Sequence, residues 1–219
     1  MLTDRGYDLI RRYEGFLRPL NDGSGRVRPY LCPANVATVG WGSTRYFSFN
    51  GVGAHVQGRV KMSDEPISRE RAEECFRGEL HQNEQAFDRY TTIKVHPLMR
   101  DAIVSFIYNC GEGAYRGSNL RRVINSGNFN RVPHELAKWR MGGGRILLGL
   151  QRRRSTEAAL FMEGVRKLAS EDHYEPNAPN APEQPEPTPT PKPTPVERPT
   201  PKQSAPKGWW RSLVDWVLK

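Results

Sequence analysis

The fold of this chain is signalled near its start, where residues 3–16 read TDRGYDLIRRYEGF. The threonine or the aspartate that opens this stretch can cap a helix, and Gly15 marks where that helix would end. Ile10 and Glu14 are four residues apart, so they share one stripe of the helix with other apolar side chains. A carboxyl group in that position is disfavoured in its charged form, which is what a general acid working near neutral pH requires. Taken alone, a glutamate at a helix end is more often structural than catalytic.

Outward from this helix, the pattern predicts a small sheet followed by many helices. Residues 18–62 contain two turn signals, Asp22-Gly23 and Asn50-Gly51, and short β-type runs, which indicate a small antiparallel sheet with irregular loops. Later helices are expected at residues 68–89, 96–111, 118–126, 129–140 and 150–169, with a loop at the three glycines 142–144. This order predicts an α+β fold with a helical majority.

The composition changes sharply towards the end of the chain. Twelve of the eighteen prolines lie between Pro176 and Pro206, so residues 173–207 are expected to form an extended, disordered Pro-rich linker. Residues 208–219 contain three tryptophans and are expected to form a short amphipathic helix suited to an interface. Residues 1–172 are left as one domain with a sizeable core.

The charge of the chain is strongly positive, because 33 Lys and Arg residues stand against 24 Asp and Glu residues and give +9. This balance suits a polyanionic partner such as nucleic acid, an anionic membrane or an acidic cell-wall polymer. Nucleic acid is disfavoured, since the chain has no recognisable binding motif and its basic residues mostly alternate with acids. The five histidines show no metal-ligand spacing, so no metal or other cofactor is expected.

The cysteines and the N-terminal residues bear on where the protein is made. The three cysteines, Cys32, Cys75 and Cys110, are odd in number and widely spaced, which is typical of a protein made in a reducing cytoplasm. The first residues lack the apolar run of a signal peptide, and no stretch approaches the ~20 apolar residues that cross a bilayer. We therefore expect a cytoplasmic protein that needs help from another protein to reach any substrate outside the membrane.

Several motifs follow one another in order along residues 2–170. They include Tyr13-Glu14-Gly15-Phe16, Pro29-Tyr30-Leu31-Cys32-Pro33-Ala34, Thr38-Val39-Gly40-Trp41-Gly42-Ser43-Thr44, Tyr108-Asn109-Cys110-Gly111 and Leu148-Gly149-Leu150. In this combination the chain resembles the phage-type lysozymes of glycoside hydrolase family 24, the endolysins of tailed phages and lambdoid prophages. The resemblance implies a lysozyme-like catalytic domain over residues 1–172, with a small antiparallel β-lobe and a mainly helical lobe.

The same resemblance implies a reaction and its residues. The family hydrolyses the β-1,4 bond between N-acetylmuramic acid and N-acetylglucosamine in peptidoglycan with a Glu, an Asp or Cys, and a Thr, and five residues lie between the last two. Glu14, Cys32 and Thr38 fit this pattern. Glu14 would protonate the leaving oxygen, and Cys32 with Thr38 would position a water on the opposite sugar face, an inverting arrangement. Asp22 is the alternative second group, although turn aspartates usually serve the turn itself.

Two departures from the family pattern concern the surroundings of these residues. Seventeen residues separate Glu14 from Cys32, where the family usually has about eight, and the extra residues fit an insertion at 20–28. The segment 46–66 is also longer than the usual family hairpin. Both differences are expected to alter substrate fit without changing the chemistry.

Further residues are assigned by the same resemblance or by local pattern. Tyr30, Asn109 and Ser118 are the expected substrate-binding residues, although Asn109 and Ser118 can also serve as helix caps. The run Arg152-Arg153-Arg154 at a helix start is expected to be a solvated face rather than a contact for an anionic polymer.

Two other functions compete with hydrolysis. A lytic transglycosylase also uses one glutamate but closes an anhydro ring without water. A non-catalytic peptidoglycan-binding module would keep the fold with a dead site. Glu14 argues against the second, and Cys32 with Thr38 at the family spacing favours a hydrolase that uses water.

The tail and the expected partners complete the prediction. Trp209, Trp210 and Trp216 can contact a membrane, or they can fold back onto the domain, and the sequence leaves both open. The resemblance implies that a holin releases the protein from the host cytoplasm to the periplasm and cell wall. We expect a monomer whose main partner is bacterial peptidoglycan.

Overall fold

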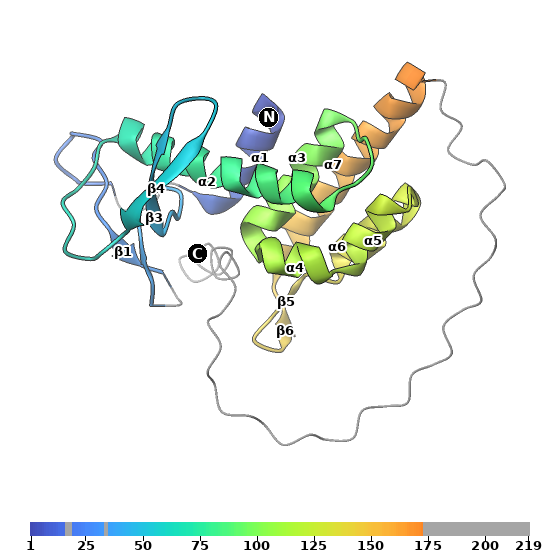
Figure 1. Cartoon of the computed structure of the whole chain (residues 1–219). Helices are drawn as coiled ribbons and strands as arrows, with labels where there is room; N and C mark the ends of the chain where they lie inside the picture. The colour runs from blue at the N-terminus through green and yellow to red at the C-terminus, as the bar shows by residue number, and fades with distance from the viewer. Residues whose placement is uncertain (16–18, 33–34, 173–219) are drawn as a thin grey trace.

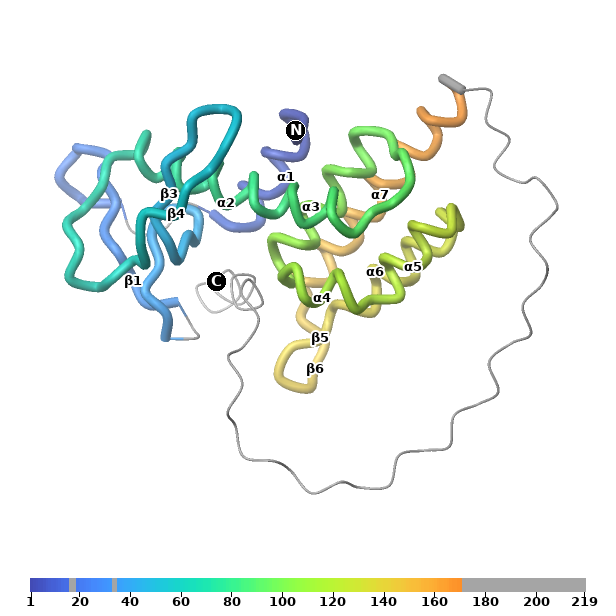
Figure 2. Tube along the Cα trace, viewed as in Figure 1, coloured from blue at the N-terminus to red at the C-terminus, as the bar shows by residue number. Residues whose placement is uncertain are grey.

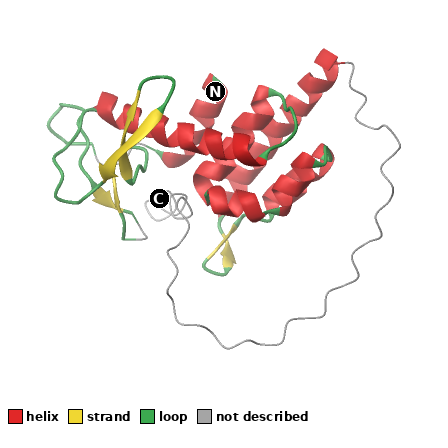
Figure 3. Ribbon diagram, in the orientation of Figure 1, coloured by secondary structure: helices red, strands yellow, loops and turns green. Residues whose placement is uncertain are grey.

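The computed structural model describes residues 1–15, 19–32 and 35–172. Most strands gather on one side of the molecule and most helices on the other (Figures 1 and 3). The helices are α1 (Asp4–Glu14), α2 (Arg69–Tyr90), α3 (Pro97–Cys110), α4 (Glu112–Gly117), α5 (Asn119–Asn125), the short 3-10 helix η1 (Phe129–Arg131), α6 (Val132–Ala137) and α7 (Leu148–Asp172). The strands are β1 (Tyr30–Leu31), β2 (Ala37–Thr38), β3 (Arg45–Phe49), β4 (Ala54–Arg59), β5 (Met141–Gly142) and β6 (Arg145–Ile146). The predicted α+β fold with a helical majority is confirmed, while the predicted linker 173–207 and helix 208–219 lie outside the described residues.

Helix α1 begins where the sequence predicts, because Thr3 caps it. The Thr3 hydroxyl accepts a hydrogen bond from the backbone N–H of Gly6, and the Thr3 N–H donates to the Asp101 carboxylate of α3 at 3.0 Å. The helix ends at Glu14, and Gly15 follows with a φ of 64°, a conformation that favours glycine. The cap and this glycine fix the place of Glu14 in the fold.

Helix α2 connects the two sides of the molecule, since it runs from the strands β3 and β4 to the helical cluster (Figure 2). Its Gly78 packs directly on Phe47 of β3, where a Cβ atom added to the glycine would lie 2.8 Å from the Phe47 Cγ. Phe47 is buried, so this close approach fastens the β3–β4 pair to the helix.

The strands form three separate two-stranded antiparallel sheets rather than the single small sheet that the sequence predicts. The pairs β1–β2 and β3–β4 lie within the predicted region, and β3–β4 carries an irregularity between Tyr46 and Phe47. The third pair, β5–β6, occupies the segment predicted as a glycine loop, where Gly143 and Gly144 form the turn with positive φ. The helix predicted over 129–140 therefore ends early, at Ala137.

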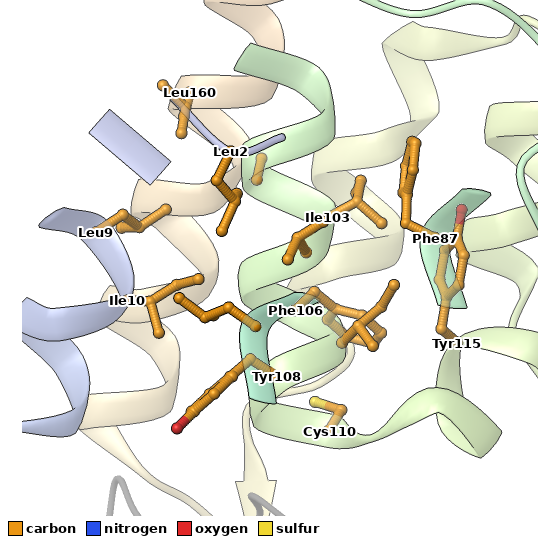
Figure 4. Close-up of a cluster of buried hydrophobic side chains, with 14 of the residues drawn as sticks. Leu2, Leu9, Ile10, Phe87, Ile103, Phe106, Tyr108, Cys110, Tyr115 and Leu160 are labelled. Carbon is orange, nitrogen blue, oxygen red and sulfur yellow. The ribbon is translucent and has the colours of Figure 1, made fainter. Parts of the chain in front are cut away.

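The core lies among α1, α3 and α7. Nearly every residue of α3 is buried. Figure 4 shows Ile10 of α1 and Leu160 of α7 on the same side of Ile103 and Phe106 of α3. The Phe106 ring meets Trp139 edge to face at 5.1 Å, which extends the core towards α6. Within the described part of the chain, no helix is both long and apolar enough to cross a bilayer.

Candidate active site

Glu14 lies at the C-terminal end of α1 with its side chain fully buried. Its stripe neighbour Ile10 is also buried, as the periodicity predicts. The carboxylate itself does not face only apolar side chains, however, because Nη1 of Arg153 on α7 donates a hydrogen bond to its Oε1 at 2.7 Å. Periodicity within one helix reveals which face is buried, but it carries no information on a partner 139 residues later.

Arg153 is itself fully buried, and it holds a second carboxylate on the same helix. Its Nε donates to Oε1 of Glu157 at 3.2 Å, and its Nη2 donates to the Ser105 carbonyl at 3.1 Å. The Ser105 hydroxyl in turn donates to Oε1 of Glu157 at 2.7 Å. One guanidinium therefore joins α1, α3 and α7 through its three nitrogens.

Arg154 extends this network to the end of α3. Its Nη2 donates to Oδ1 of Asn109 at 3.0 Å and to Oε1 of Glu157 at 2.9 Å, while its Nη1 lies 3.1 Å from the Cys110 sulfur. The expectation that the arginine run forms a solvated face is wrong for two of its three members: Arg153 is 0% and Arg154 2% exposed, and only Arg152 faces solvent. The buried carboxylates explain the difference, because each guanidinium finds a counter-charge inside the domain.

We call Glu14, Arg153, Arg154 and Glu157 the ionic network; it contains two carboxylates and two guanidiniums. Burial alone lowers the pKa of Arg153, but the charges of Glu14 and Glu157 outweigh that effect and raise it above its ordinary value. Burial also raises the pKa of the Cys110 thiol, despite the neighbouring arginines, so this cysteine remains neutral. The network is balanced in charge, which is the condition for keeping ionised groups inside a protein.

Contacts beside the network hold α1 on α7. The Tyr13 hydroxyl lies 2.7 Å from the Thr156 hydroxyl, and the Arg153 guanidinium carbon lies 5.5 Å from the centre of the Tyr13 ring. Since Tyr13 precedes Glu14 and Thr156 precedes Glu157, these contacts fix the spacing of the two carboxylates.

Tyr30, Cys32 and Thr38 come together on the β1–β2 pair. Tyr30 and Thr38 are register partners, and the Cys32 N–H donates to the Val36 carbonyl at 3.0 Å just beyond the paired residues. Thr38 is buried and Cys32 is half-buried. The Thr38 hydroxyl donates to the Val36 carbonyl at 2.9 Å, which leaves its oxygen lone pairs available as acceptors.

The segment after β2 is tied to the helix that carries Asn109. The Tyr108 hydroxyl of α3 donates to the Trp41 carbonyl at 3.2 Å, and Trp41 packs on Phe76 of α2 with ring centroids 5.5 Å apart. The β1–β2 pair and the ionic network are thus held to one framework, although they come from opposite sides of the molecule.

Asp22 lies in an exposed turn, where its carboxylate accepts hydrogen bonds from the Ser24 N–H at 2.9 Å and the Ser24 hydroxyl at 2.5 Å. The Ser24 bonds hold the pKa of the Asp22 carboxyl below its ordinary value, with a smaller contribution from Arg26. The carboxylate therefore serves its own turn, as aspartates in turns commonly do.

The two remaining predicted substrate residues, Asn109 and Ser118, form hydrogen bonds within the protein. Asn109 is fully buried and accepts from Arg154, so it orients that arginine. Ser118 caps α5, since its hydroxyl accepts from the Arg121 N–H at 3.0 Å and donates to the Tyr115 carbonyl at 2.8 Å. Its predicted capping role is confirmed, whereas a sugar contact by either residue stays a prediction. Across the described ranges, no three His, Cys, Asp or Glu side chains are grouped so that they could hold a metal ion.

A family model described as phage lysozyme matches residues 21–157, more than half of the chain. The chain belongs to the phage lysozyme family. Cys32, Thr38, Arg153 and Glu157 lie within the matched residues of this family, whereas Glu14 precedes them.

Relatives within the family are phage endolysins. Those of Bacillus phages B103 and PZA are 36% and 28% identical over 110 and 169 residues, which is 50% and 77% of this chain but 42% and 58% of the relatives. The chain therefore spans about half the length of these two proteins. The endolysin of Salmonella phage P22 is 26% identical over 161 residues, which cover 74% of this chain and 97% of the relative.

Solved structures show the same fold at low sequence identity. An endolysin from Escherichia coli O157:H7 phage FAHEc1 matches 74% of this chain and 94% of its own with a TM-score of 0.60 and 24% identity. A mutant form of P22 lysozyme matches with a TM-score of 0.54 and 23% identity over 74% of this chain and 98% of its own. The predicted lysozyme-like fold is confirmed.

Proposed function

We propose that this chain is an endolysin that hydrolyses the β-1,4 bond between N-acetylmuramic acid and N-acetylglucosamine in bacterial peptidoglycan. The observation that carries the proposal is the buried pair of Glu14 and Arg153, 2.7 Å apart, at the end of α1 in a member of the phage lysozyme family. A lone buried carboxylate is costly, and a glutamate held by an arginine from a distant helix is placed there by the whole fold.

In this proposal Glu14 is the general acid. It protonates the glycosidic oxygen as the bond breaks, and Arg153 fixes the orientation of its carboxyl group and stabilises the carboxylate left after the proton has gone. Because the Glu14 side chain is fully buried here, binding of the glycan has to expose it.

Cys32 and Thr38 are proposed to hold the attacking water. The Thr38 hydroxyl gives its hydrogen to Val36, so its oxygen can accept a hydrogen bond from water. Cys32 is half-buried and directly follows β1, and in this proposal its thiol is the second group that binds the water. In this proposal the water attacks from the β1–β2 side, while the leaving group receives its proton from Glu14 on α1. Attack and departure then take place on opposite sugar faces, which inverts the anomeric centre. Tyr30, which pairs with Thr38, and Asn109 and Ser118 on the helical side are the proposed glycan contacts.

The test is digestion of purified peptidoglycan by the wild-type chain and four variants: Glu14→Gln, Cys32→Ser, Asp22→Asn and Glu135→Gln. Glu135 is a matched control, because it is a buried glutamate paired with Lys138 at 2.7 Å, apart from the ionic network. Products are analysed by mass and by reducing ends. We expect muropeptides that end in reducing N-acetylmuramic acid from wild type and Glu135→Gln, and a loss of about 100-fold or more for Glu14→Gln.

The other outcomes separate the competing functions. Anhydro products would assign the chain to the lytic transglycosylases, and folded protein without products would make it a peptidoglycan-binding module. A larger loss of activity in Asp22→Asn than in Cys32→Ser would make Asp22, in its exposed turn, the second catalytic group. Inversion is checked by following the anomer first formed from a soluble glycan by NMR.

The tail and the route to the substrate belong to the same proposal. Trp209, Trp210 and Trp216 lie outside the described residues; we propose that they contact a membrane after a holin has released the protein. Replacing all three by serine in the full chain should spare digestion of purified peptidoglycan and reduce lysis of intact cells. Equal lysis by both proteins would remove the membrane contact.

A further inference from the structure

Glu157 is the most heavily bonded carboxylate of the ionic network, although it lies behind Arg153 as seen from Glu14. Its Oε1 accepts from Ser105, Arg153 and Arg154 at 2.7, 3.2 and 2.9 Å, and its Oε2 lies 2.8 Å from Nε of Arg154. The side chain is fully buried. A carboxylate with this many donors and no solvent is fixed in place, so it can fix its partners.

We propose that Glu157 is a positioning residue for Glu14: it aims the Arg153 guanidinium at the Glu14 carboxyl and cancels the charge of Arg154. The inference rests on the proposed role of Glu14 as the general acid. Neither part of it requires Glu157 to touch the glycan.

The aim of Arg153 follows from its three nitrogens. Nη1 reaches Glu14, Nε reaches Glu157, and Nη2 reaches Ser105, which is itself bonded to Glu157. The planar guanidinium is therefore held on two of its edges by groups that Glu157 organises, and its remaining nitrogen points at the acid. Without Glu157, the arginine keeps Glu14 and Ser105 but loses the anchor at Nε.

Glu157 balances the charge of the groups around it, which come from three helices. Arg153 and Arg154 face it from its own helix, and Glu14 lies across Arg153 from α1. The groups that α3 brings to the network are uncharged: Ser105 donates to Glu157, and Asn109 and the Cys110 thiol, which burial keeps neutral, contact Arg154. With Glu157 present, the network sums to zero; without it, one carboxylate faces two guanidiniums. That excess positive charge favours the ionised form of Glu14, which cannot donate a proton.

Four variants separate charge from shape, and a fifth is the control. Glu157→Gln removes one negative charge, Arg154→Gln removes one positive charge, and the double variant restores the balance while Arg153 and Glu14 remain. Glu157→Asp keeps the charge in a shorter side chain, and Glu135→Gln is the control for loss of a buried glutamate elsewhere. Circular dichroism and thermal melting establish which variants fold.

The first readout is kcat/KM against pH on a soluble peptidoglycan fragment. Because Glu14 must be protonated to act, its titration sets the alkaline limb of the profile. We expect Glu157→Gln to move that limb about one pH unit lower, with about a tenfold loss of kcat/KM on the alkaline side. Arg154→Gln should move the limb higher, and the double variant and Glu157→Asp should return it towards the wild-type position.

The second readout needs no activity. Carbon-13 NMR of labelled glutamate carboxyls, with the Glu14 signal assigned from Glu14→Gln, follows the Glu14 titration directly and should show the same shifts. An unmoved Glu14 titration in both Glu157→Gln and Arg154→Gln would overturn the inference. If one variant fails to fold, the direction of the shift in the other, lower for Glu157→Gln and higher for Arg154→Gln, decides alone. If the Glu14 titration moves as expected in the variants but the wild-type protein releases no muropeptides, the proposed function is overturned, and the coupling of Glu157 to Glu14 stands.

Discussion

Arg153→Met gives a direct test of what the ionic network contributes to stability. The substitution removes a fully buried guanidinium and keeps an apolar side chain of similar length. It leaves the carboxylate of Glu14 without its ion pair to Arg153, whereas Glu157 retains Arg154. The cost is therefore concentrated on Glu14 and on the polar groups of Ser105.

The magnitude follows from the contacts that disappear. Arg153 donates to Glu14 at 2.7 Å, to Glu157 at 3.2 Å, and to the Ser105 carbonyl and hydroxyl at 3.1 and 3.3 Å. Removing one partner of a buried ion pair costs about 3–5 kcal/mol, because the other charge stays buried without its counter-charge. Against a total unfolding free energy of about 5–15 kcal/mol, we expect the variant to fold and to lose about 4 kcal/mol. Adding Glu14→Gln should recover about 2 kcal/mol, since the buried negative charge is then gone.

Urea denaturation of the full chain at neutral pH, followed by circular dichroism, measures these differences. Arg5→Met is the matched control, because Arg5 pairs with Glu163 through two hydrogen bonds but is 54% exposed, and surface pairs contribute only about 0–1 kcal/mol. A loss below about 1 kcal/mol for Arg153→Met, or strict additivity with Glu14→Gln, would refute the reasoning.

Three further predictions concern the framework. Gly78→Ala should lower the unfolding free energy by about 1–3 kcal/mol, because the added Cβ would lie 2.8 Å from Phe47 Cγ. Gly113→Ala is the control: no atom lies within 4 Å of the added carbon, so this substitution should be neutral or stabilising. The two variants are compared by their urea midpoints. Burial raises the pKa of Tyr115 from 10.0 to about 12. The stability that the neutral Tyr115 hydroxyl contributes is therefore fully present below pH 10 and is lost as the pH rises through about 12. Melting curves at alkaline pH should show this loss in the wild type but not in Tyr115→Phe. Ser118→Ala should cost about 1 kcal/mol through the lost cap of α5, and no change in melting temperature would contradict the capping role.

Helix positions are largely readable from the sequence, because the signals that set them are local. Thr3, Ser68, His96 and Ser118 cap the helices α1, α2, α3 and α5 at the predicted residues, with Pro97 following His96 in the first turn. The strands were predicted less well. Two-residue strands such as β5 and β6 are too short for a periodic pattern, and their glycines also fit a loop.

The sequence pattern does not predict the ionic network, although all four of its residues can be found in the sequence. Three consecutive arginines look like a solvated face, and the only local signal against it is Glu157, at helical spacing from both Arg153 and Arg154. That spacing is equally common on exposed helices. What buries these side chains is α3, whose Ser105 and Asn109 supply the additional hydrogen bonds.

The network also supports the proposal that Glu14 is the general acid. The match to the phage lysozyme family begins at residue 21, so Glu14 lies outside it, while Arg153 and Glu157 fall near its far end. The structure connects the two, since Arg153 reaches across from α7 to Glu14 on α1. The support for Glu14 as the proposed acid is therefore independent of the spacing of motifs along the chain. Glu14 ends a helix, and it shares the buried guanidinium of Arg153 with a second carboxylate, that of Glu157. The proposed acid is thus held in place by residues that lie 139 and more positions away along the chain.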